Sequence, residues 1–430
     1  MTALLMERPV RRGACPGLSA PMPTGDGLLV RLLPTGTIPL AAFVQLCAAA
    51  RQFGNGVVEI TSRGSIQVRG LSEDSVPRFA EAVAALGIAA DESIPVLAGA
   101  LAGLDAAEII DASVLAVKMR AALSKTTLAA RLAPKVSIVI DGGGTIGLDE
   151  ISADVRLSAE KTYADVTLRV AVGGDEKTAI PLGAVAAARA VEAVTGLLEV
   201  VAQRGRTARA RDVLAREGAA PFRAAVAELL LPNTPRPPTS QHADAIGKHM
   251  LRDASFACGI GLAFGHADAA NLERLAEAAG KTGAAGFRAG APRALLTIGL
   301  DRTAAAAFVA AAANLGFIVE PSDPRRHVIA CAGAPICSSA HLASRSLAPL
   351  VAGTVGSVAG GPPQVHISGC AKSCAHAGSA ALTVVGSPAG CALIANGTAR
   401  DAPFAIIAAS ELPAAIEQYF REPKRETGHI

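Results

Sequence analysis

The chain is poor in aromatic side chains, because its 430 residues include no Trp and only two Tyr. Proteins that hold single-stranded nucleic acid stack the bases on exposed aromatic rings, so a role of that kind is not expected. The formal net charge is only +3, which also argues against a general nucleic-acid binder. Nucleic acid is therefore not an expected partner.

Long hydrophobic runs are missing as well, although 51% of the residues are hydrophobic. No stretch approaches the ~18 uninterrupted apolar residues of a membrane span. The segment AAAAFVAAAANLGF is interrupted by Asn314 and Gly316 and predicts a buried, alanine-rich helix. The N-terminal MTALLMERPVRRGACPG has charges on both sides of a very short apolar run and no signal-peptide core. We therefore expect a cytoplasmic location and no contact with a membrane.

The order of predicted elements occurs twice along the chain. In the first copy, Leu28–Leu33 and Val57–Thr61 have the pattern of strands, and Leu40–Phe53 between them has helical spacing. The second copy repeats this order far downstream, with strands at Ile260–Phe264 and Ala294–Gly299 and a helix at Ala269–Ala279. A chain of this length is expected to form two to four domains, and the repeat indicates that two of them are related.

The two copies can be aligned with Arg63 on Arg293 and with Gly70 on Gly299. A further helix follows in each copy, at Val76–Leu86 and Ala304–Leu315. The resulting order is typical of a ferredoxin-like half domain. Strands are also predicted at Val136–Ile140 and Thr167–Val172, and the proline-rich LPNTPRPPTS at 231–240 indicates a linker between the halves.

Four of the eight cysteines form two close pairs near the C-terminus. Five residues separate Cys331 from Cys337, and three separate Cys370 from Cys374. Paired cysteines in a reducing compartment are more often metal or redox ligands than disulfides. They could be small buried hydrophobes or zinc ligands, although five intervening residues are unusual for zinc. The abundance of Gly and Ala around them favours an iron–sulfur cluster. The other four, Cys15, Cys47, Cys258 and Cys391, are interpreted as packing residues.

These cysteine spacings and the duplicated half domain resemble the sirohaem-dependent sulfite and nitrite reductase superfamily. The resemblance implies that Cys331, Cys337, Cys370 and Cys374 bind one 4Fe–4S cluster, with Cys374 facing a tetrapyrrole cavity. It also implies an α+β fold in which duplicated ferredoxin-like half domains and two mixed α/β reductase-like domains adopt a pseudo-twofold arrangement. The expected ranges are 1–95 and 251–325 for the half domains, 96–230 and 326–430 for the mixed domains, the latter binding the cluster, and 231–250 for the linker.

Some residues depart from the reductase pattern. The segment ITSRGSIQVRG resembles the arginine strand of the reductases, so Arg63 is carried over. Their Lys-x-Lys pair is matched only at Lys135, because Ser137 stands at the second lysine. The segment ADESIPVLAG also lacks their motif rich in Asn and Arg. A site that must polarise a small oxyanion has therefore lost part of its positive charge.

Within the superfamily, three segments resemble the precorrin-3B synthase family: RRGACPGLSAPMPTGDGLLVRL, LAGLDAAEIID and IDGGGTIGLDE. This resemblance implies dioxygen-dependent hydroxylation of precorrin-3A at carbon 20, with closure of a γ-lactone. It implies a 4Fe–4S cluster, a separate non-haem iron in place of sirohaem, and an electron donor that the sequence does not identify. A sirohaem-dependent reductase and a non-enzymatic iron–sulfur sensor or carrier are the alternatives.

Precorrins carry many carboxylates, which a guanidinium fork matches well. The motif context assigns substrate binding to Arg63 and Lys135. Arg69 and Arg288 are interpreted as solvated surface charges, and Arg293 and Lys372 lie beside the predicted site.

Histidines near the cysteines and one glycine-rich turn leave alternatives open. His366 and His376 flank the second cysteine pair and could be iron ligands, structural residues or hydrogen-bond donors to the cluster. The DGGG segment at Asp141–Gly144 could approach a ligand or form a hairpin turn.

Overall fold

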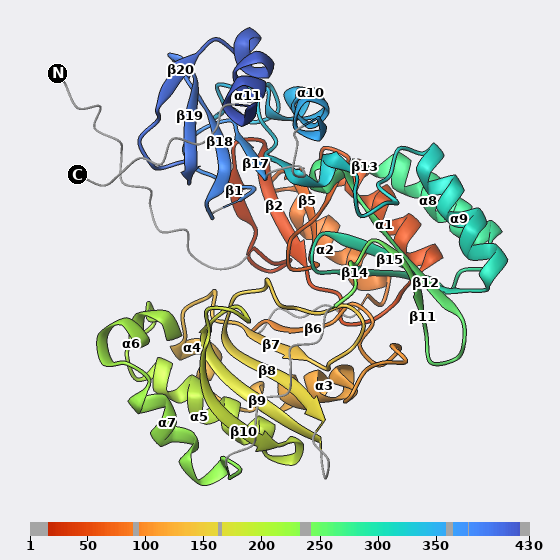
Figure 1. The fold of residues 1–430 in the computed structure, drawn as a ribbon. Helices are drawn as coiled ribbons and strands as arrows, with labels where there is room; N and C mark the ends of the chain where they lie inside the picture. Colours follow the sequence, from red (N-terminus) through yellow and green to blue (C-terminus); the bar gives the residue numbers. More distant parts are fainter. Residues whose placement is uncertain are drawn as a thin grey trace.

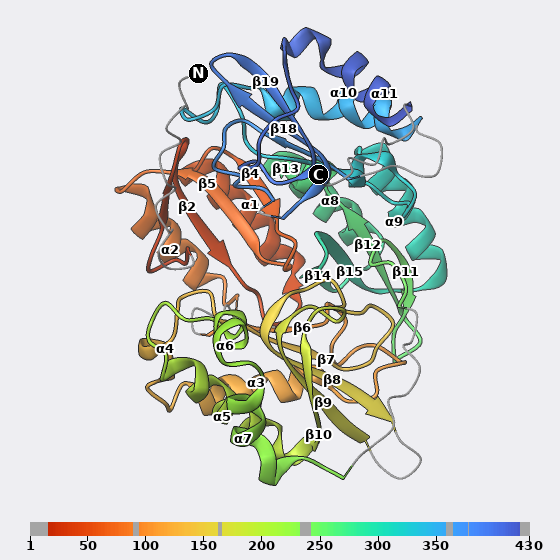
Figure 2. The ribbon, with the colours of Figure 1, turned by 60° about the vertical axis from the view of Figure 1, so that its left-hand side comes forward.

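The computed structural model describes residues 16–88, 94–161, 166–232, 242–357, 364–376 and 378–421. Within these residues the strands form four sheets of five strands each. Figures 1 and 2 show two central units, coloured red to orange and green to teal. A yellow and green domain lies against one side of them and a blue domain against the other. The predicted α+β class is confirmed.

The first central unit is a sheet covered by helices, as the hydrophobic spacing predicted. Helix α1 begins after Pro39 and ends before Gly54, whose extended backbone stops the helical hydrogen bonding. Its elements are β1 (Met22–Thr24), β2 (Gly27–Leu32), α1 (Leu40–Phe53), β4 (Val57–Ile60), β5 (Ile66–Leu71) and α2 (Ser75–Ala85).

The second central unit repeats this order. Helix α9 begins after Asp301, whose carboxylate accepts a hydrogen bond from the backbone N–H of Ala304 at 2.7 Å. Its elements are β11 (Gly247–Met250), β12 (Phe256–Gly261), the 3-10 turn η3 (Ala263–Gly265), α8 (Ala269–Lys281), β14 (Gly286–Gly290), β15 (Ala294–Leu300) and α9 (Arg302–Asn314).

The two units exchange a short strand. Strand β3 (Ile38–Pro39) comes from the first unit but pairs with β14 of the second. Reciprocally, β13 (His266–Asp268) comes from the second unit and pairs with β4 of the first. The sheet orders are therefore β1-β2-β5-β4-β13 and β11-β12-β15-β14-β3, which are equivalent. Neither sheet is complete without the other half.

The alignment of Gly70 with Gly299 has a structural cause. Each glycine lies where the register of its strand shifts, opposite Leu28–Val30 for Gly70 and opposite Phe256–Cys258 for Gly299. Their φ angles are 72° and 86°, a region that side chains with a Cβ adopt at a cost. Both positions are β-bulges, and a bulge of this kind favours glycine. The repeat seen in the sequence is thus present in backbone geometry.

The first mixed domain has a sheet of order β10-β9-β8-β7-β6, in which β6, β7 and β8 are parallel and the rest antiparallel. Helix α3 begins after Asp111, whose side chain accepts hydrogen bonds from two backbone N–H groups. The elements are β6 (Val96–Ala98), α3 (Ala112–Leu123), α4 (Leu128–Arg131), β7 (Ile138–Asp141), β8 (Ala153–Lys161), β9 (Val166–Gly174), β10 (Ile180–Ala186), η1 (Ala187–Arg189), α5 (Ala190–Ala202), α6 (Ala210–Glu217), α7 (Ala220–Val226) and η2 (Ala227–Leu229).

The second mixed domain has the same topology. Its strands β16, β17 and β18 are parallel, and β19 and β20 continue the sheet antiparallel. The elements are η4 (Pro324–His327), β16 (Val328–Ala330), α10 (Ser344–Gly356), β17 (Val365–Ser368), β18 (Ala380–Ser387), β19 (Gly390–Gly397), β20 (Ala405–Ile407), η5 (Ala409–Glu411) and α11 (Leu412–Arg421). The pseudo-twofold relation therefore includes the mixed domains.

Three details differ from the sequence-based expectations. The predicted strand Ile260–Phe264 lies earlier, at β12, because the chain turns at Phe264 with a φ of 61°. The expected linker ends too late at residue 250, because β11 already pairs with β12. The DGGG segment is not a hairpin, because β7 and β8 run parallel. Residues 233–241 of the linker and residues 90–93 of ADESIPVLAG lie outside the described residues.

Among the described residues, no helix is long and apolar enough to span a membrane.

A shared hydrophobic core joins the two central units. Phe43 on α1 and Phe287 on β14 are 1% and 0% exposed, and their ring centroids are 4.7 Å apart. The surrounding cluster draws buried side chains from both units. Because burial of apolar surface is the main source of folding free energy, this core holds the exchanged sheets together.

We predict that Phe43→Ala destabilises the central pair of sheets. Truncating a fully buried aromatic side chain typically costs about 3–5 kcal/mol, part of which is due to the cavity left behind. The control Val117→Ala removes a side chain that is 61% exposed and is expected to change stability by less than about 0.5 kcal/mol. Urea unfolding followed by circular dichroism measures both. Equal unfolding midpoints for the two variants would contradict the assigned core.

Candidate functional site

The two cysteine pairs lie on neighbouring loops at one edge of a sheet. Cys331 directly follows β16, and Cys370 follows β17 by two residues. These strands are parallel neighbours, so their C-terminal ends meet at the same edge. All four thiols, Cys331, Cys337, Cys370 and Cys374, line one cavity of about 250 Å³. The sequence therefore predicted correctly that the two pairs come together.

The first central unit supplies another wall of this cavity. Gly25 lies in the turn between β1 and β2, and its carbonyl oxygen accepts a hydrogen bond from the N–H of Ser338 at 2.9 Å. A Cβ atom at Gly25 would lie only 2.3 Å from the Sγ of Cys337. Only glycine lets the backbone approach the cysteine loop this closely.

The contacts of the thiols suit a cluster better than a zinc ion. The backbone N–H of Gly369 donates a hydrogen bond to the Sγ of Cys331 at 3.0 Å, a contact of the kind that tunes iron–sulfur clusters. Burial raises the pKa of Cys370, and the charges of the other three thiols raise it further. No three of the four Sγ atoms lie within 4.8 Å of one another. Tetrahedral zinc with bonds of ~2.3 Å would need closer sulfurs, so the donor set fits a larger inorganic group.

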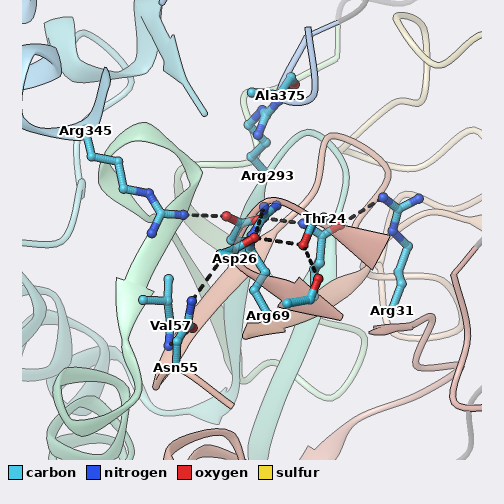
Figure 3. A network of polar contacts seen from close by, with 12 residues as sticks. Thr24, Asp26, Arg31, Asn55, Val57, Arg69, Arg293, Arg345 and Ala375 are labelled. Atoms are coloured by element: carbon cyan, nitrogen blue, oxygen red, sulfur yellow. Dashed lines mark hydrogen bonds and ion pairs between the residues drawn. The ribbon is translucent and has the colours of Figure 1, made fainter. Parts of the chain in front are cut away.

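Figure 3 shows a network of buried charges, one member of which, Arg69, also lines the cysteine cavity. Arg69, which lines the cavity, donates two hydrogen bonds to Asp26, at 2.8 and 2.6 Å. Glu59 pairs with Arg345 and lies 3.9 Å from Arg69. The network joins the β1–β2 turn, β4 and β5 of the first central unit to α10 of the second mixed domain.

Electrostatics keep this network ionised. Burial lowers the pKa of Arg69, but the hydrogen bond to Asp26 and the charge of Glu59 outweigh that effect and raise it. Burial raises the pKa of Asp26, and its contacts with Arg69 outweigh burial and lower it. The charge of Cys374 also acts on Arg69, and that of Cys331 on Arg345. The two guanidinium groups are thus positioned to offset negative charge on the thiolates.

The interpretation of Arg69 and Arg288 as solvated surface charges is wrong. Arg69 is only 6% exposed, because it pairs with Asp26 and lines the cavity that the cysteine loops of the second mixed domain enclose. Arg288 is half-buried and donates hydrogen bonds to Thr37 at 2.9 Å and to the carbonyl oxygen of Ala102 at 2.8 Å. Both arginines lie between structural units.

Arg63 and its pseudo-equivalent Arg293 extend from the central units into different mixed domains. Arg63 donates to the Oγ of Ser137 at 3.0 Å and to the carbonyl oxygen of Ser152 at 2.6 Å. Arg293 donates to the carbonyl oxygen of Ala375, in the second cysteine loop, at 3.1 Å. The pseudo-twofold relation therefore directs one arginine to each mixed domain.

The other basic residues of the predicted site are exposed. Lys135 lies two residues before Ser137 and is open to solvent. Lys372 lines the cysteine cavity and donates from its Nζ to the Oγ of Ser339 at 2.8 Å. Ser137 itself is only 1% exposed and does not face solvent.

The two histidines near the cysteines have different environments. His366 is 0% exposed, and neither ring nitrogen has a hydrogen-bond partner within the part of the chain that the structure describes. Burial lowers its pKa to about 4, so the ring is neutral near pH 7. The ring of His376 packs edge-to-face against the ring of His366, with the two centroids 5.5 Å apart. The Nε2 of His376 lies 3.3 Å from the carbonyl oxygen of Ser379.

The remaining described cysteines fit their predicted packing role. Cys47, Cys258 and Cys391 are at most 1% exposed, and Cys15 lies outside the described residues. Sequence reasoning missed Asp26, Glu59 and Arg345, whose partners lie far from them along the chain. The segment TGDG around Asp26 is a local signal for a turn, but it does not indicate an ion pair.

Comparisons with known proteins agree with this architecture. Residues 20–86 match the family described as nitrite/sulfite reductase ferredoxin-like half domain. The solved structure of the NirA protein of Mycobacterium tuberculosis is similar, with a TM-score of 0.72 and 20% identity, covering 91% of this chain and 79% of that one. This structural likeness shows the shared fold.

Relatives found by sequence similarity narrow the comparison further than the shared fold does. A Sinorhizobium sp protein named precorrin-3B synthase is 39% identical over 397 residues, or 92% of this chain and 85% of that protein. The ferredoxin–nitrite reductase of Synechococcus elongatus is 24% identical, covering 83% of this chain and 75% of its own. The assimilatory ferredoxin-dependent nitrite reductase of Haloferax mediterranei is 23% identical, covering 78% and 64%.

We predict that Gly25→Ala loses most of the iron and sulfide bound by the protein. The added Cβ would collide with the Sγ of Cys337, so the cysteine loop could not keep its position. Gly36→Ala is the matched control, because Gly36 lies in a bend between β2 and β3 with nothing within 4 Å of the added atom. Iron and acid-labile sulfide are measured after anaerobic purification. Full iron and sulfide in Gly25→Ala would show that the β1–β2 turn does not shape the site.

Proposed function

The chain belongs to the precorrin-3B synthase family, and from this premise we propose that it hydroxylates precorrin-3A at carbon 20 in a dioxygen-dependent reaction that closes a γ-lactone. Members of this family are enzymes of the oxidoreductase type, and a precorrin tetrapyrrole is the substrate that the relative's name indicates. Dioxygen and an electron donor are further partners in the proposal, and sirohaem is not expected.

The proposed reaction balances as a monooxygenation. One atom of dioxygen enters the carbon 20 position, and the acetate side chain forms the lactone. The other oxygen atom leaves as water, which requires two electrons from the donor and two protons. When bound, a 4Fe–4S cluster on Cys331, Cys337, Cys370 and Cys374 supplies single electrons, and a non-haem iron supplies activation of dioxygen.

Arg63 and Lys135 are the proposed carboxylate binders. The guanidinium of Arg63 is oriented by its hydrogen bonds to Ser137 and Ser152, so its planar fork is held in place before substrate binds. Lys135 is exposed two residues away, and its flexible ammonium can reach a second carboxylate. Acetate and propionate groups suit both partners.

The observation that carries the choice of a hydroxylase over a reductase is the environment of Ser137. This residue stands where the reductases are expected to have a second lysine, and here it is buried and accepts a hydrogen bond from Arg63. A neutral hydroxyl cannot supply the charge that a small oxyanion needs, but it leaves room for a larger substrate. Oxygenation of a precorrin has no need of that second ammonium.

The first test is oxygen uptake by the anaerobically purified protein with precorrin-3A and a reductant. Uptake that depends on precorrin-3A is expected, together with broad iron–sulfur absorption and no tetrapyrrole bands in the protein as isolated. Tetrapyrrole bands with sulfite or nitrite consumption would favour a sirohaem reductase. A cluster without any substrate-dependent uptake would indicate a sensor or carrier.

We predict that Cys331→Ala, Cys337→Ala and Cys370→Ala each lose cluster and activity together, because each thiolate provides one ligand. Electron paramagnetic resonance of the reduced proteins measures the cluster, and Cys391→Ala, a buried thiol outside the cavity, is the control. A full cubane signal in all three variants would place the ligands elsewhere.

We predict that Arg63→Ala weakens precorrin binding while the cluster signal remains. Loss of a charge-assisted hydrogen bond costs about 1.5–3 kcal/mol, which corresponds to roughly ten- to hundred-fold in affinity at ~1.4 kcal/mol per decade. Lys135→Ala is expected to act in the same direction, and Lys281→Ala, an exposed lysine at the end of α8, is the control. Wild-type affinity in Arg63→Ala and Lys135→Ala would mean that the carboxylates bind elsewhere.

We predict that Ser137→Lys impairs hydroxylation without creating sulfite reduction. The longer side chain would bring an ammonium beside the guanidinium of Arg63 and fill space in a buried position. Ser137→Ala removes only the hydroxyl and is expected to have a smaller effect. Steady-state oxygen uptake with precorrin-3A compares the two, and iron content checks that the fold persists. Unchanged turnover and affinity in Ser137→Lys would show that this position does not line the site.

A further inference from the structure

The pseudo-twofold fold contains a second pair of loops equivalent to the cysteine loops. In the first mixed domain, residues 99–111 follow β6 and residues 142–152 follow β7, as the cysteine loops follow β16 and β17. They pack on the second central unit, since Ala100 and Ile146 share a buried cluster with Ile246 and Leu296. These loops have no cysteine. They do have carboxylates, and a histidine lies against them.

We propose that Asp141, Asp149 and His242 form a binding site for a divalent transition-metal ion such as Mn²⁺, Fe²⁺ or Zn²⁺. Each aspartate offers a carboxylate oxygen and the histidine offers a ring nitrogen, and these three atoms all lie within 4.8 Å of one another. No other set of three His, Cys, Asp or Glu side chains in the described part of the chain meets that condition. None of the three residues lines the cysteine cavity, so the site is separate from it.

The imidazole of His242 is oriented as a metal ligand. Its Nδ1 lies 3.1 Å from the carbonyl oxygen of Gly144, and donation of that N–H leaves the lone pair on Nε2. The Nε2 atom lies 3.6 Å from the Oδ1 of Asp149, longer than a hydrogen bond. A backbone carbonyl that fixes the other ring nitrogen is the usual support of a ligating histidine. A Cβ at Gly147 would lie 2.3 Å from the ring, so glycine there makes room for it.

The carboxylate of Asp141 is oriented by the loop that it begins. It is 6% exposed and accepts hydrogen bonds from the N–H groups of Gly143 at 2.9 Å and Leu148 at 3.0 Å. Each of its oxygens therefore keeps one further lone pair available for a metal ion. Asp149 is more exposed, with 38% of its side chain open to solvent, so it provides the side from which an ion enters.

The donor set indicates the class of metal ion. Ca²⁺ and Mg²⁺ prefer ligand sets made of oxygen, whereas an imidazole together with carboxylates suits Mn²⁺, Fe²⁺ or Zn²⁺. Three protein ligands leave coordination positions for water or another small molecule. Binding at this site does not depend on the proposed oxidation of a precorrin, and its failure would leave that proposal untouched.

The test uses manganese, which is distinct from the iron of a cluster. The anaerobically purified full chain is treated with a chelator, titrated with Mn²⁺ under electron paramagnetic resonance, and analysed for retained manganese after gel filtration. One Mn²⁺ per chain is expected. Asp149→Asn and His242→Gln are each expected to weaken binding by at least roughly tenfold, since loss of even a supporting partner costs that much.

Glu150→Gln is the matched control, because it removes an exposed carboxylate from the same loop without touching the three ligands. It is expected to bind Mn²⁺ as the wild type does. The proposal is overturned if the wild type retains no manganese, or if Asp149→Asn and His242→Gln bind it as tightly as Glu150→Gln. Iron and sulfide content and the circular dichroism spectrum are measured on every variant to show that the fold persists.

Discussion

The exchange of one short strand between the two central units is the constraint on which the rest of the structure depends. Strand β3 completes the sheet of the second unit, and β13 completes that of the first. An open sheet edge exposes unpaired backbone N–H and C=O groups, so each unit alone would leave such groups without hydrogen-bond partners. The exchange also brings the turn between β4 and β5 close to the turn between β14 and β15, since a Cβ at Gly64 would lie 2.8 Å from Gly290. From these turns, Arg63 and Arg293 each reach a different mixed domain.

The two halves of the duplicated fold carry different functional side chains in equivalent loops. In the second mixed domain, four thiols line a cavity whose walls include Gly25 and Arg69 of the first central unit. Removing charges from water is expensive unless they are paired and hydrogen-bonded. The pairs Arg69–Asp26 and Arg345–Glu59 meet that condition and set positive groups beside the thiols. In the first mixed domain, the equivalent loops carry carboxylates and glycines, with His242 beside them.

Local patterns in the sequence predicted the repeated elements well, and contacts between distant segments were missed. Helix Leu40–Phe53 was predicted to its ends, because hydrophobic spacing and the glycines that follow are local signals. The cysteine pairs were found because the two cysteines of each pair lie within a few residues of one another in the sequence. Arg69 was misassigned, because the local sequence of β5 does not reveal that this side chain pairs with Asp26 and lines a cavity shared with another domain. The approach of His242 to Asp149 spans 93 positions, 242 minus 149, and no local pattern encodes it.

The central claim is that the protein inserts oxygen into a precorrin, with the four thiols as ligands of the cluster and Arg63 as a binder of substrate carboxylates. The most direct measurement is mass analysis of precorrin-3A after incubation with the anaerobically purified protein, a reductant and ¹⁸O-labelled dioxygen. The account predicts a product that has gained one oxygen atom, and that this atom carries the label. An unchanged precorrin, or a product whose added oxygen comes from water, would contradict it.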